Sequence, residues 1–151
     1  MTTAETKPRL ILAIGNVGRK DDGLAWAFAQ KLEQSQPDYW QVEYRYQLQI
    51  EDAELMSHFT EVFIVDAAKQ ASKAPFFVES CQASNDVAFS THALSPSTVL
   101  GLCVDIYGTH PKVKILGIVG YEWQLEPGLS PEAEVNLRLA WHHFAQHQVL
   151  S

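Results

Sequence analysis

The feature that most constrains the fold is an acidic loop that directly follows a run of apolar residues. Residues 9–14 end in five consecutive apolar side chains, which predicts a buried strand. The loop begins with Gly15 and Asn16, both of which favour turns, and then carries the adjacent carboxylates Asp21 and Asp22. Two neighbouring acids repel each other, so at least one needs a cation, a hydrogen-bond donor or a raised pKa. Because α/β proteins bind ligands at the carboxyl edge of their sheets, this loop is the first candidate for chemistry.

The hydrophobic pattern along the rest of the chain alternates between helical and strand periodicity, which is typical of an α/β domain. The predicted elements are a helix over 22–36, a half-exposed edge strand over 40–49, a short helix over 50–59, buried strands over 62–66, 76–78 and 114–119, a helix over 96–107 that begins at a Ser-Pro step, and a last helix that begins at Pro131.

The strand at 76–78 is too close to the strand at 62–66 for a helical crossover, so it should run antiparallel to its neighbours. We therefore expect a three-layer α/β/α sandwich around a mixed, mostly parallel five-stranded sheet with one antiparallel strand. Residues 1–151 are expected to form a single domain, since the sequence contains no linker and no repeat.

The composition argues against several classes of function. The formal net charge is -7, with no basic stripe, which disfavours nucleic-acid binding. No apolar run is long enough to span a membrane, and residues 1–8 lack the apolar core of a signal peptide. The two cysteines, Cys81 and Cys103, have no metal-like spacing and are expected to be buried thiols. We expect a cytoplasmic protein.

Three groups with metal-binding chemistry should meet at the carboxyl edge of this sheet. Asp22 follows the first strand, Asp66 ends the central strand, and His92 closes the loop that returns the chain to this edge. Two carboxylates and an imidazole suit a divalent metal such as Ni²⁺ or Zn²⁺ and leave coordination positions open. The spacing alone also allows ordinary roles, because an aspartate at a strand end often caps a turn and a loop histidine often only faces solvent.

Other catalytic patterns are missing from the sequence. There is no Gly-x-Ser-x-Gly nucleophile elbow and no phosphate-binding loop, and no organic cofactor is expected. The aromatic side chains of Tyr121 and Trp123 lie just beyond the last strand, where they could wall a peptide-binding cleft or only pack.

Taken together, these motifs resemble those of the hydrogenase maturation proteases, which trim the C-terminus of the large subunit of nickel-iron hydrogenases. The resemblance extends over nearly the whole chain, although Ala25 and Trp26 stand where relatives often have a glycine and a small or aliphatic residue. The matching motifs are Gly15-Asn16 with Asp21-Asp22-Gly23, then Asp66-Ala67, the Ser-Thr-His-x-Leu-Ser box over 90–95, and the Leu-Ser step at 129–130 that enters the last helix.

This resemblance implies a metal site formed by Asp22, Asp66 and His92. These residues would read nickel that is already inserted in the precursor of the large subunit, so the metal would be supplied by the substrate. Cleavage would follow at one bond beyond the precursor's C-terminal cysteine motif. Asp22 or Asp66 would act as the general base, and which of them does so stays open, as does whether the metal is catalytic or only recognised.

The resemblance also implies roles in substrate binding for Gly15, Asn16 and Asp21. Gly15 and Asn16 would shape the turn that presents Asp22, and Asp21 would lie behind the groups that contact the metal. The expected partner is the large-subunit precursor, and we expect the protein itself to be a monomer.

Two other functions remain open at this point. The protein could be a non-catalytic nickel-checkpoint binder of the same precursor, because the sequence contains no self-evident nucleophile. A peptidyl-tRNA hydrolase-like esterase also opens with a Gly-Asn-x-Gly turn after its first strand, but the acidic charge and the acids at 21 and 22 argue against that activity.

Overall fold

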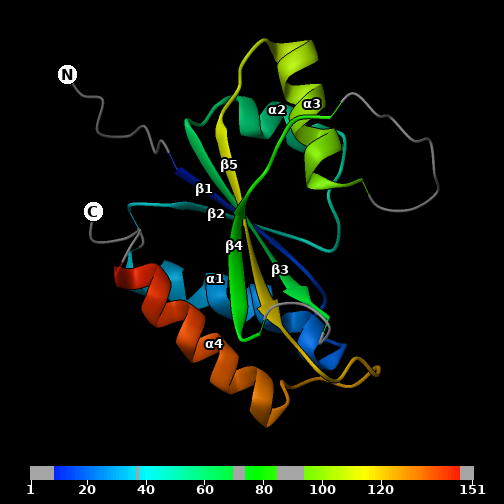
Figure 1. The fold of residues 1–151 in the computed structure, drawn as a ribbon, viewed down its shortest axis with the longest axis vertical. Helices are drawn as coiled ribbons and strands as arrows, with labels where there is room; N and C mark the ends of the chain where they lie inside the picture. Colours follow the sequence, from blue (N-terminus) through cyan, green and yellow to red (C-terminus); the bar gives the residue numbers. More distant parts are fainter. Residues whose placement is uncertain (1–8, 37, 70–73, 85–93, 147–151) are drawn as a thin grey trace.

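Five strands form one mixed sheet through the middle of the molecule (Figure 1). The computed structural model describes residues 9–36, 38–69, 74–84 and 94–146. The strands are β1 (Arg9–Ile14), β2 (Gln41–Arg45), β3 (Glu61–Ala68), β4 (Phe76–Ser80) and β5 (Lys112–Val119). Their order across the sheet is β2-β1-β3-β5-β4, and every neighbouring pair is parallel except β4 and β5. The predicted five-stranded sheet with one antiparallel strand is confirmed.

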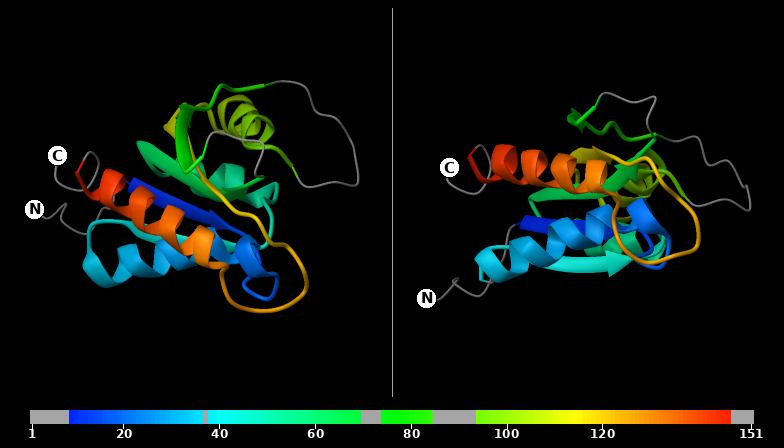
Figure 2. Two further views of the ribbon diagram at one scale, coloured as in Figure 1. Left: turned by 60° about the horizontal axis from the view of Figure 1, so that its bottom comes forward. Right: turned by 90° about the horizontal axis from the view of Figure 1, so that it is seen from below.

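Helices cover both faces of this sheet. α1 (Leu24–Ser35) and α4 (Pro131–Phe144) lie side by side on one face, whereas α2 (Glu51–Ser57) and α3 (Pro96–Tyr107) lie on the other (Figure 1, Figure 2). A 3₁₀ turn, η2 (Lys20–Gly23), joins the acidic loop to α1. The three-layer sandwich predicted from the sequence is confirmed.

The core has two halves because successive residues of a strand point to opposite faces of the sheet. In β1, Ile11 and Ala13 pack toward α1 and α4, while Leu10 and Leu12 pack toward α2 and α3. All four side chains are fully buried. The half below α1 and α4 also contains a group of buried aromatic rings in mutual contact, formed by Phe28, Trp40, Phe63 and Phe144.

Two helices begin with a serine cap followed by proline, at the positions predicted for their starts. Ser95 Oγ accepts a hydrogen bond from Thr98 N at the start of α3, and Ser130 Oγ accepts one from Ala133 N at the start of α4. In both helices proline occupies the first turn, where its missing N–H costs no hydrogen bond. Both caps lie at the carboxyl edge of the sheet, because α3 and α4 begin there.

The start of α1 differs from the prediction, which placed it at Asp22. The acidic pair belongs to η2, and α1 begins at Leu24. The backbone N–H of Asp22 donates to Arg19 O, and that of Asp21 donates to Glu122 O in a distant loop. The hydrogen bond to the distant loop therefore helps to fix the backbone conformation at Asp21, where the sequence pattern predicts the start of an α-helix one residue later.

Two strands also differ in extent. β2 ends at Arg45, four residues before the predicted end, and the chain then turns toward α2. β3 continues beyond Asp66 to Ala68, because β5 runs alongside it and pairs Ala68 with Val119. Asp66 therefore lies inside its strand and is not the last residue of it.

Both cysteines are buried and free, as predicted. Cys103 is fully enclosed in the core, and Cys81 lies beside Ser97, with its Sγ 3.7 Å from the serine hydroxyl. Burial raises the pKa of the Cys81 thiol, so this group is poorly suited to act as a nucleophile. Within the described residues, no helix combines the length and the apolar character that crossing a membrane requires.

Candidate active site

Asp22 and Asp66 line one cavity at the carboxyl edge of the sheet. Because β1 and β3 are adjacent and parallel, Ile14 at the end of β1 pairs with Asp66, and the loop that follows Ile14 brings Asp22 to the same place. The cavity has a volume of about 280 Å³. Its described lining residues are Ile14, Gly15, Asp22, Tyr46, Gln47, Leu48, Ile64, Asp66, Leu94 and Pro96.

The charge of Asp22 affects the pKa of Asp66 in this cavity. Burial raises the pKa of Asp66 to about 7, and the charge of Asp22 adds to this rise, although the hydrogen bond from Ala67 N opposes it. That bond is 2.8 Å long and ends on Asp66 Oδ1. At neutral pH, Asp66 is therefore poised between its protonated and ionised forms. A carboxyl group in this state can hold a cation or accept a proton.

The pKa of Asp22 is also raised by burial. The backbone of Asn16 and the positive charges of Arg19 and Lys69 oppose this rise. Both cations contact Trp123. Lys69 Nζ lies 4.4 Å from the centroid of the Trp123 ring, and Arg19 donates a hydrogen bond to the Trp123 carbonyl oxygen. The two acids thus have different surroundings, although burial raises the pKa of both.

The turn at Gly15 and Asn16 holds Asp22 at the cavity. Asn16 N donates to the carbonyl oxygen of Asp22, and Asn16 Oδ1 accepts a hydrogen bond of 2.8 Å from Gly18 N. A Cβ at position 15 would lie 2.1 Å from the Asp22 carbonyl oxygen, so only glycine allows this approach. Gly15 lines the cavity, while Asn16 stabilises the turn beside it.

Asp21 has a different environment from Asp22. It is fully buried, and its carboxylate accepts hydrogen bonds from the backbone N–H groups of Tyr121, Glu122 and Ser130 and from the Ser130 hydroxyl. Burial alone would raise its pKa, but these hydrogen bonds lower it below the ordinary value. Asp21 has no accessible surface and does not line the cavity, so it does not fit direct contact with a ligand there. Its role behind the groups that would contact a metal stays a prediction.

The third predicted metal ligand, His92, lies outside the described residues. Within the part of the chain that is described, histidine, cysteine and acidic side chains form no group of three or more that could hold a metal ion. Asp22 and Asp66 are thus the predicted ligands that the structure brings together.

Tyr121, Glu122 and Trp123 do not line this cavity. Tyr121 accepts a hydrogen bond from Asn136 Nδ2, and Glu122 is paired with Lys20. Trp123 holds the two cations that face Asp22. The aromatic side chains of Tyr121 and Trp123 therefore do not form a wall of this cavity, and of the two roles left open for them, packing is the one seen here.

The rest of the cavity wall was not predicted from the sequence. Tyr46, Gln47 and Leu48 follow β2, and Leu94 and Pro96 lie at the start of α3. The place of Tyr46, Gln47 and Leu48 could have been predicted, because a strand parallel to β1 has its carboxyl end at the same edge of the sheet as Asp22. The prediction of a strand that continued to residue 49 concealed it.

Solved structures with this fold include several hydrogenase maturation proteases. The hydrogenase maturating endopeptidase HybD from E. coli aligns with a TM-score of 0.70 and 23% identity, over 91% of this chain and 90% of its own. The maturation protease HycI from Thermococcus kodakarensis gives 0.68 and 21%, over 93% and 91%. The hydrogenase 2 maturation peptidase from a Thaumarchaeota archaeon gives 0.67 and 18%, over 95% and 99%.

The sequence comparisons add no assignment, since no protein-family model matches the chain and no curated protein sequence matches it significantly. These structural alignments cover nearly the whole length of this chain and of each solved structure. They show that this chain has the fold of the hydrogenase maturation proteases, as its motifs predict.

Proposed function

We propose that this protein is a hydrogenase maturation endopeptidase, which removes the C-terminal extension from the nickel-loaded precursor of a nickel-iron hydrogenase large subunit. The observation that carries the proposal is the meeting of Asp22 and Asp66 in one cavity. The motifs that contain them occur in the order of the protease family, on a fold shared with proteins named as maturation endopeptidases.

The chemistry of the two acids supports this proposal. Carboxylate oxygens are suitable ligands for a divalent metal, and an imidazole from His92 would complete a mixed oxygen and nitrogen set. In the proposed function the nickel belongs to the substrate. Asp22 and Asp66 would recognise it, and the protein would therefore act only on a precursor that has already been loaded.

The raised pKa values of both acids suit them to proton transfer. In hydrolysis, water adds to the carbonyl carbon of the scissile peptide bond and loses a proton to a carboxylate. The carbon–nitrogen bond then breaks, and the departing amine takes up a proton. In this proposal either Asp22 or Asp66 would serve as this base, and separate substitutions of each would distinguish their roles.

A loaded and an unloaded precursor provide the direct test. We expect the intact mass of the nickel-loaded precursor to fall by one C-terminal peptide after incubation with this protein, while the mass of the nickel-free precursor stays constant. The Asp22→Ala variant should leave the loaded precursor uncut and should unfold at a temperature no lower than that of the wild type. Undiminished cleavage by this variant would refute the assignment.

The same experiment separates the endopeptidase from a nickel-checkpoint binder. A binder would form a complex with the loaded precursor in a pull-down and would leave its mass unchanged. Within this proposal the protein acts as a monomer in the cytoplasm, where a reducing environment would keep the buried thiols of Cys81 and Cys103 free. The molar mass of the isolated protein in solution tests the prediction of a monomer, which requires the mass of one chain, 16.9 kDa.

A further inference from the structure

Two positively charged side chains act on Asp22 from outside the cavity. Arg19 belongs to the acidic loop, and Lys69 directly follows β3; both side chains are exposed. Burial raises the pKa of Asp22, and the charges of both cations oppose this rise. Neither cation lines the cavity, and neither forms an ion pair with an acid in the described part of the chain. Two unneutralised positive charges therefore lie next to the candidate active site.

Trp123 holds both cations. Its ring centroid lies 4.4 Å from Lys69 Nζ, and its carbonyl oxygen accepts a hydrogen bond of 3.0 Å from Arg19 Nη1. A ring face and a carbonyl oxygen attract a cation but have no net charge, so they fix the position of the cation and leave its charge uncompensated. The two charges are thus positioned before a ligand arrives, which lowers the entropic cost of binding.

Trp123 is itself fixed by contacts between distant segments. A Cβ at position 120 would lie 3.1 Å from the Trp123 ring, so the indole packs closely on Gly120. Gly120 N donates a hydrogen bond of 2.9 Å to the carbonyl oxygen of Ala68, directly before Lys69. The acidic loop is bonded to the same segment, because the carboxylate of Asp21 accepts two of its backbone N–H groups. The fold therefore holds together the three segments that carry the cations and the tryptophan.

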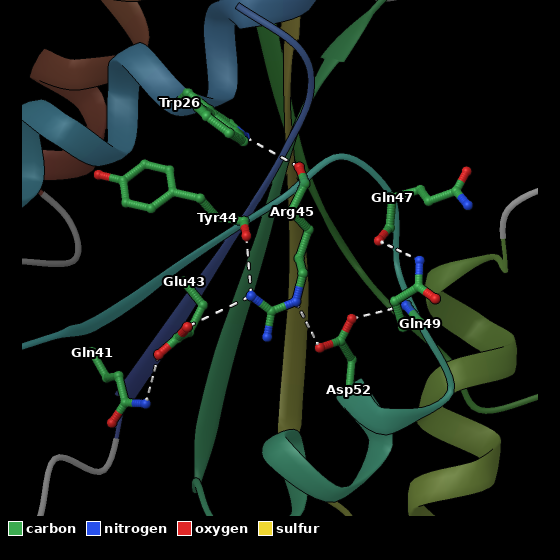
Figure 3. Close-up of polar contacts among 8 residues, drawn as sticks. All are labelled: Trp26, Gln41, Glu43, Tyr44, Arg45, Gln47, Gln49 and Asp52. Carbon is green, nitrogen blue, oxygen red and sulfur yellow. Dashed lines mark hydrogen bonds and ion pairs between the residues drawn. The ribbon is translucent and has the colours of Figure 1, made fainter.

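Other cations at this edge of the sheet are neutralised by acids. Arg45, at the end of β2, lies 3.0 Å from Asp52 Oδ1 and 3.6 Å from Glu43 Oε1 (Figure 3). Lys20 lies 3.9 Å from Glu122 Oε1. The whole chain has a formal net charge of -7, so most of its cations have acids available to them. A pair of cations held by uncharged groups is therefore a specific feature, and it favours a negatively charged ligand.

The position of this pair indicates which part of the precursor would provide that ligand. In the proposed function Asp22 and Asp66 face the nickel, and the chain before the cleaved bond is held to this metal. The C-terminal extension is the part that is free to reach beyond the cavity. The two acids would repel a carboxylate of the extension, and Arg19 and Lys69 would attract it, which directs it to their side of the cavity.

We infer that Arg19 and Lys69, held by Trp123, form a subsite for a carboxylate of the precursor's C-terminal extension. The inference rests on the proposed function and adds the charge that the site selects in its substrate. The carboxylate belongs to an acidic side chain or to the terminus of the extension, which present the same chemistry. Trp123 is a positioning residue, because it acts through the two cations that it holds.

A panel of nickel-loaded precursors tests the subsite. The residues after the first in the extension are replaced one at a time by Glu, Gln or Lys, and both binding and cleavage are measured. We expect Glu to be preferred over Gln at one position or more by about three- to tenfold, mainly through a lower KM, and Lys to be disfavoured. Because the cations are exposed, the preference should shrink when the salt concentration rises from about 0.1 M to about 1 M.

A second series distinguishes the two sources of the carboxylate. A short glycine tail added to the extension moves its terminal carboxylate and leaves every side chain in place. If the terminus is the ligand, the tail raises KM and Glu gives no gain over Gln. If an acidic side chain is the ligand, the tail has no effect and the preference for Glu remains.

Variants of the subsite should change the ratio of kcat/KM for the Glu and Gln precursors. Lys69→Gln and Arg19→Gln should each lower this ratio, the double variant should bring it close to one, and Lys69→Arg should retain it. Trp123→Leu should lower it as well, since the cations lose their support. A general loss of activity would lower both rates and leave the ratio unchanged. Lys31→Gln is the matched control, because Lys31 Nζ also lies over an indole, 5.8 Å from the ring centroid of Trp141.

The outcomes separate the subsite from the proposed function. Cleavage that ignores both the charge series and the glycine tail, equal sensitivity in the wild type and the double variant, or a wild-type preference for Lys would overturn the subsite and leave the endopeptidase standing. Binding that favours a carboxylate without any change in precursor mass would support the subsite and refute the endopeptidase. If the wild type neither binds nor cleaves any precursor of the panel, both are refuted.

Discussion

The hydroxyl of Ser130 donates a hydrogen bond of 2.7 Å to Asp21 Oδ2, and its oxygen also accepts the hydrogen bond from Ala133 N that caps α4. One side chain therefore joins the N-terminus of the last helix to the acidic loop, across 109 positions of the chain. Because Asp21 directly precedes Asp22, this contact fixes one side of the candidate active site. The position of Asp22 thus depends on packing at the other end of the sequence.

Replacing Asp21 by asparagine should destabilise the protein by about 2–3 kcal/mol. The carboxylate accepts four hydrogen bonds, and the amide group of asparagine would bring N–H groups toward other N–H donors. Urea unfolding measures the loss. Asp105→Asn, at an exposed position of α3, is the control and should change the free energy of unfolding by less than about 0.5 kcal/mol. Equal effects of the two substitutions would contradict the role assigned to Asp21.

Replacing Ser130 by alanine should cost more than the same change at Ser95. Both serines cap helices, a contribution of about 1 kcal/mol, but Ser130 also donates to the buried carboxylate of Asp21. Thermal unfolding of Ser130→Ala and Ser95→Ala compares them directly. Ser130→Thr retains the hydroxyl and should recover most of the loss. If the two alanine variants unfold alike, the bond to Asp21 contributes little.

Replacing Asp66 by asparagine should stabilise the metal-free protein at pH 8 by up to roughly 4 kcal/mol. Burial and the charge of Asp22 raise the pKa of Asp66 to about 7, so the folded protein retains a proton that the unfolded chain loses near pH 4. The stability contributed by this group is therefore fully present below about pH 4 and is lost as the pH rises from there through 7. Asparagine carries no charge and escapes this loss.

Urea unfolding of the wild type and Asp66→Asn at several pH values between 4 and 8 tests the sign of this effect. The advantage of the variant should shrink toward pH 4, and the Asp105→Asn control should show no such trend. A difference that does not change with pH would indicate an ordinary pKa for Asp66.

Replacing Gly15 by alanine should strongly reduce cleavage of the loaded precursor. A Cβ at this position would overlap the carbonyl oxygen of Asp22, and the backbone would have to shift at the residue that lines the cavity. Gly18→Ala is the matched control within the same loop, since its Cβ would meet only the end of the Asn16 side chain, at 3.2 Å. We expect the control to retain most of the activity, and similar losses in both variants would argue against a specific role for Gly15.

Much of the architecture could be predicted from the sequence because it depends on local patterns. Apolar runs marked the buried strands, and Ser-Pro steps marked the starts of α3 and α4. The meeting of Asp22 and Asp66 also followed from local information. Asp66 lies near the carboxyl end of β3 and Asp22 in the loop that follows β1, and the carboxyl ends of parallel strands share one edge of a sheet.

The rest was decided by contacts between distant parts of the chain. Residue patterns alone do not distinguish Asp21 from Asp22, and only the family resemblance gave them different roles. The donors at residues 121–130 that contact Asp21 come from the loop before α4. The wall at Tyr46 likewise depends on where β2 ends and on the contacts of that segment with Trp26 and Asp52. Local residue patterns determined the elements and the edge at which the acids meet. Burial and long-range hydrogen bonds, which exist only after folding, decided how Asp21 is held and how the pKa values of the three acids are shifted.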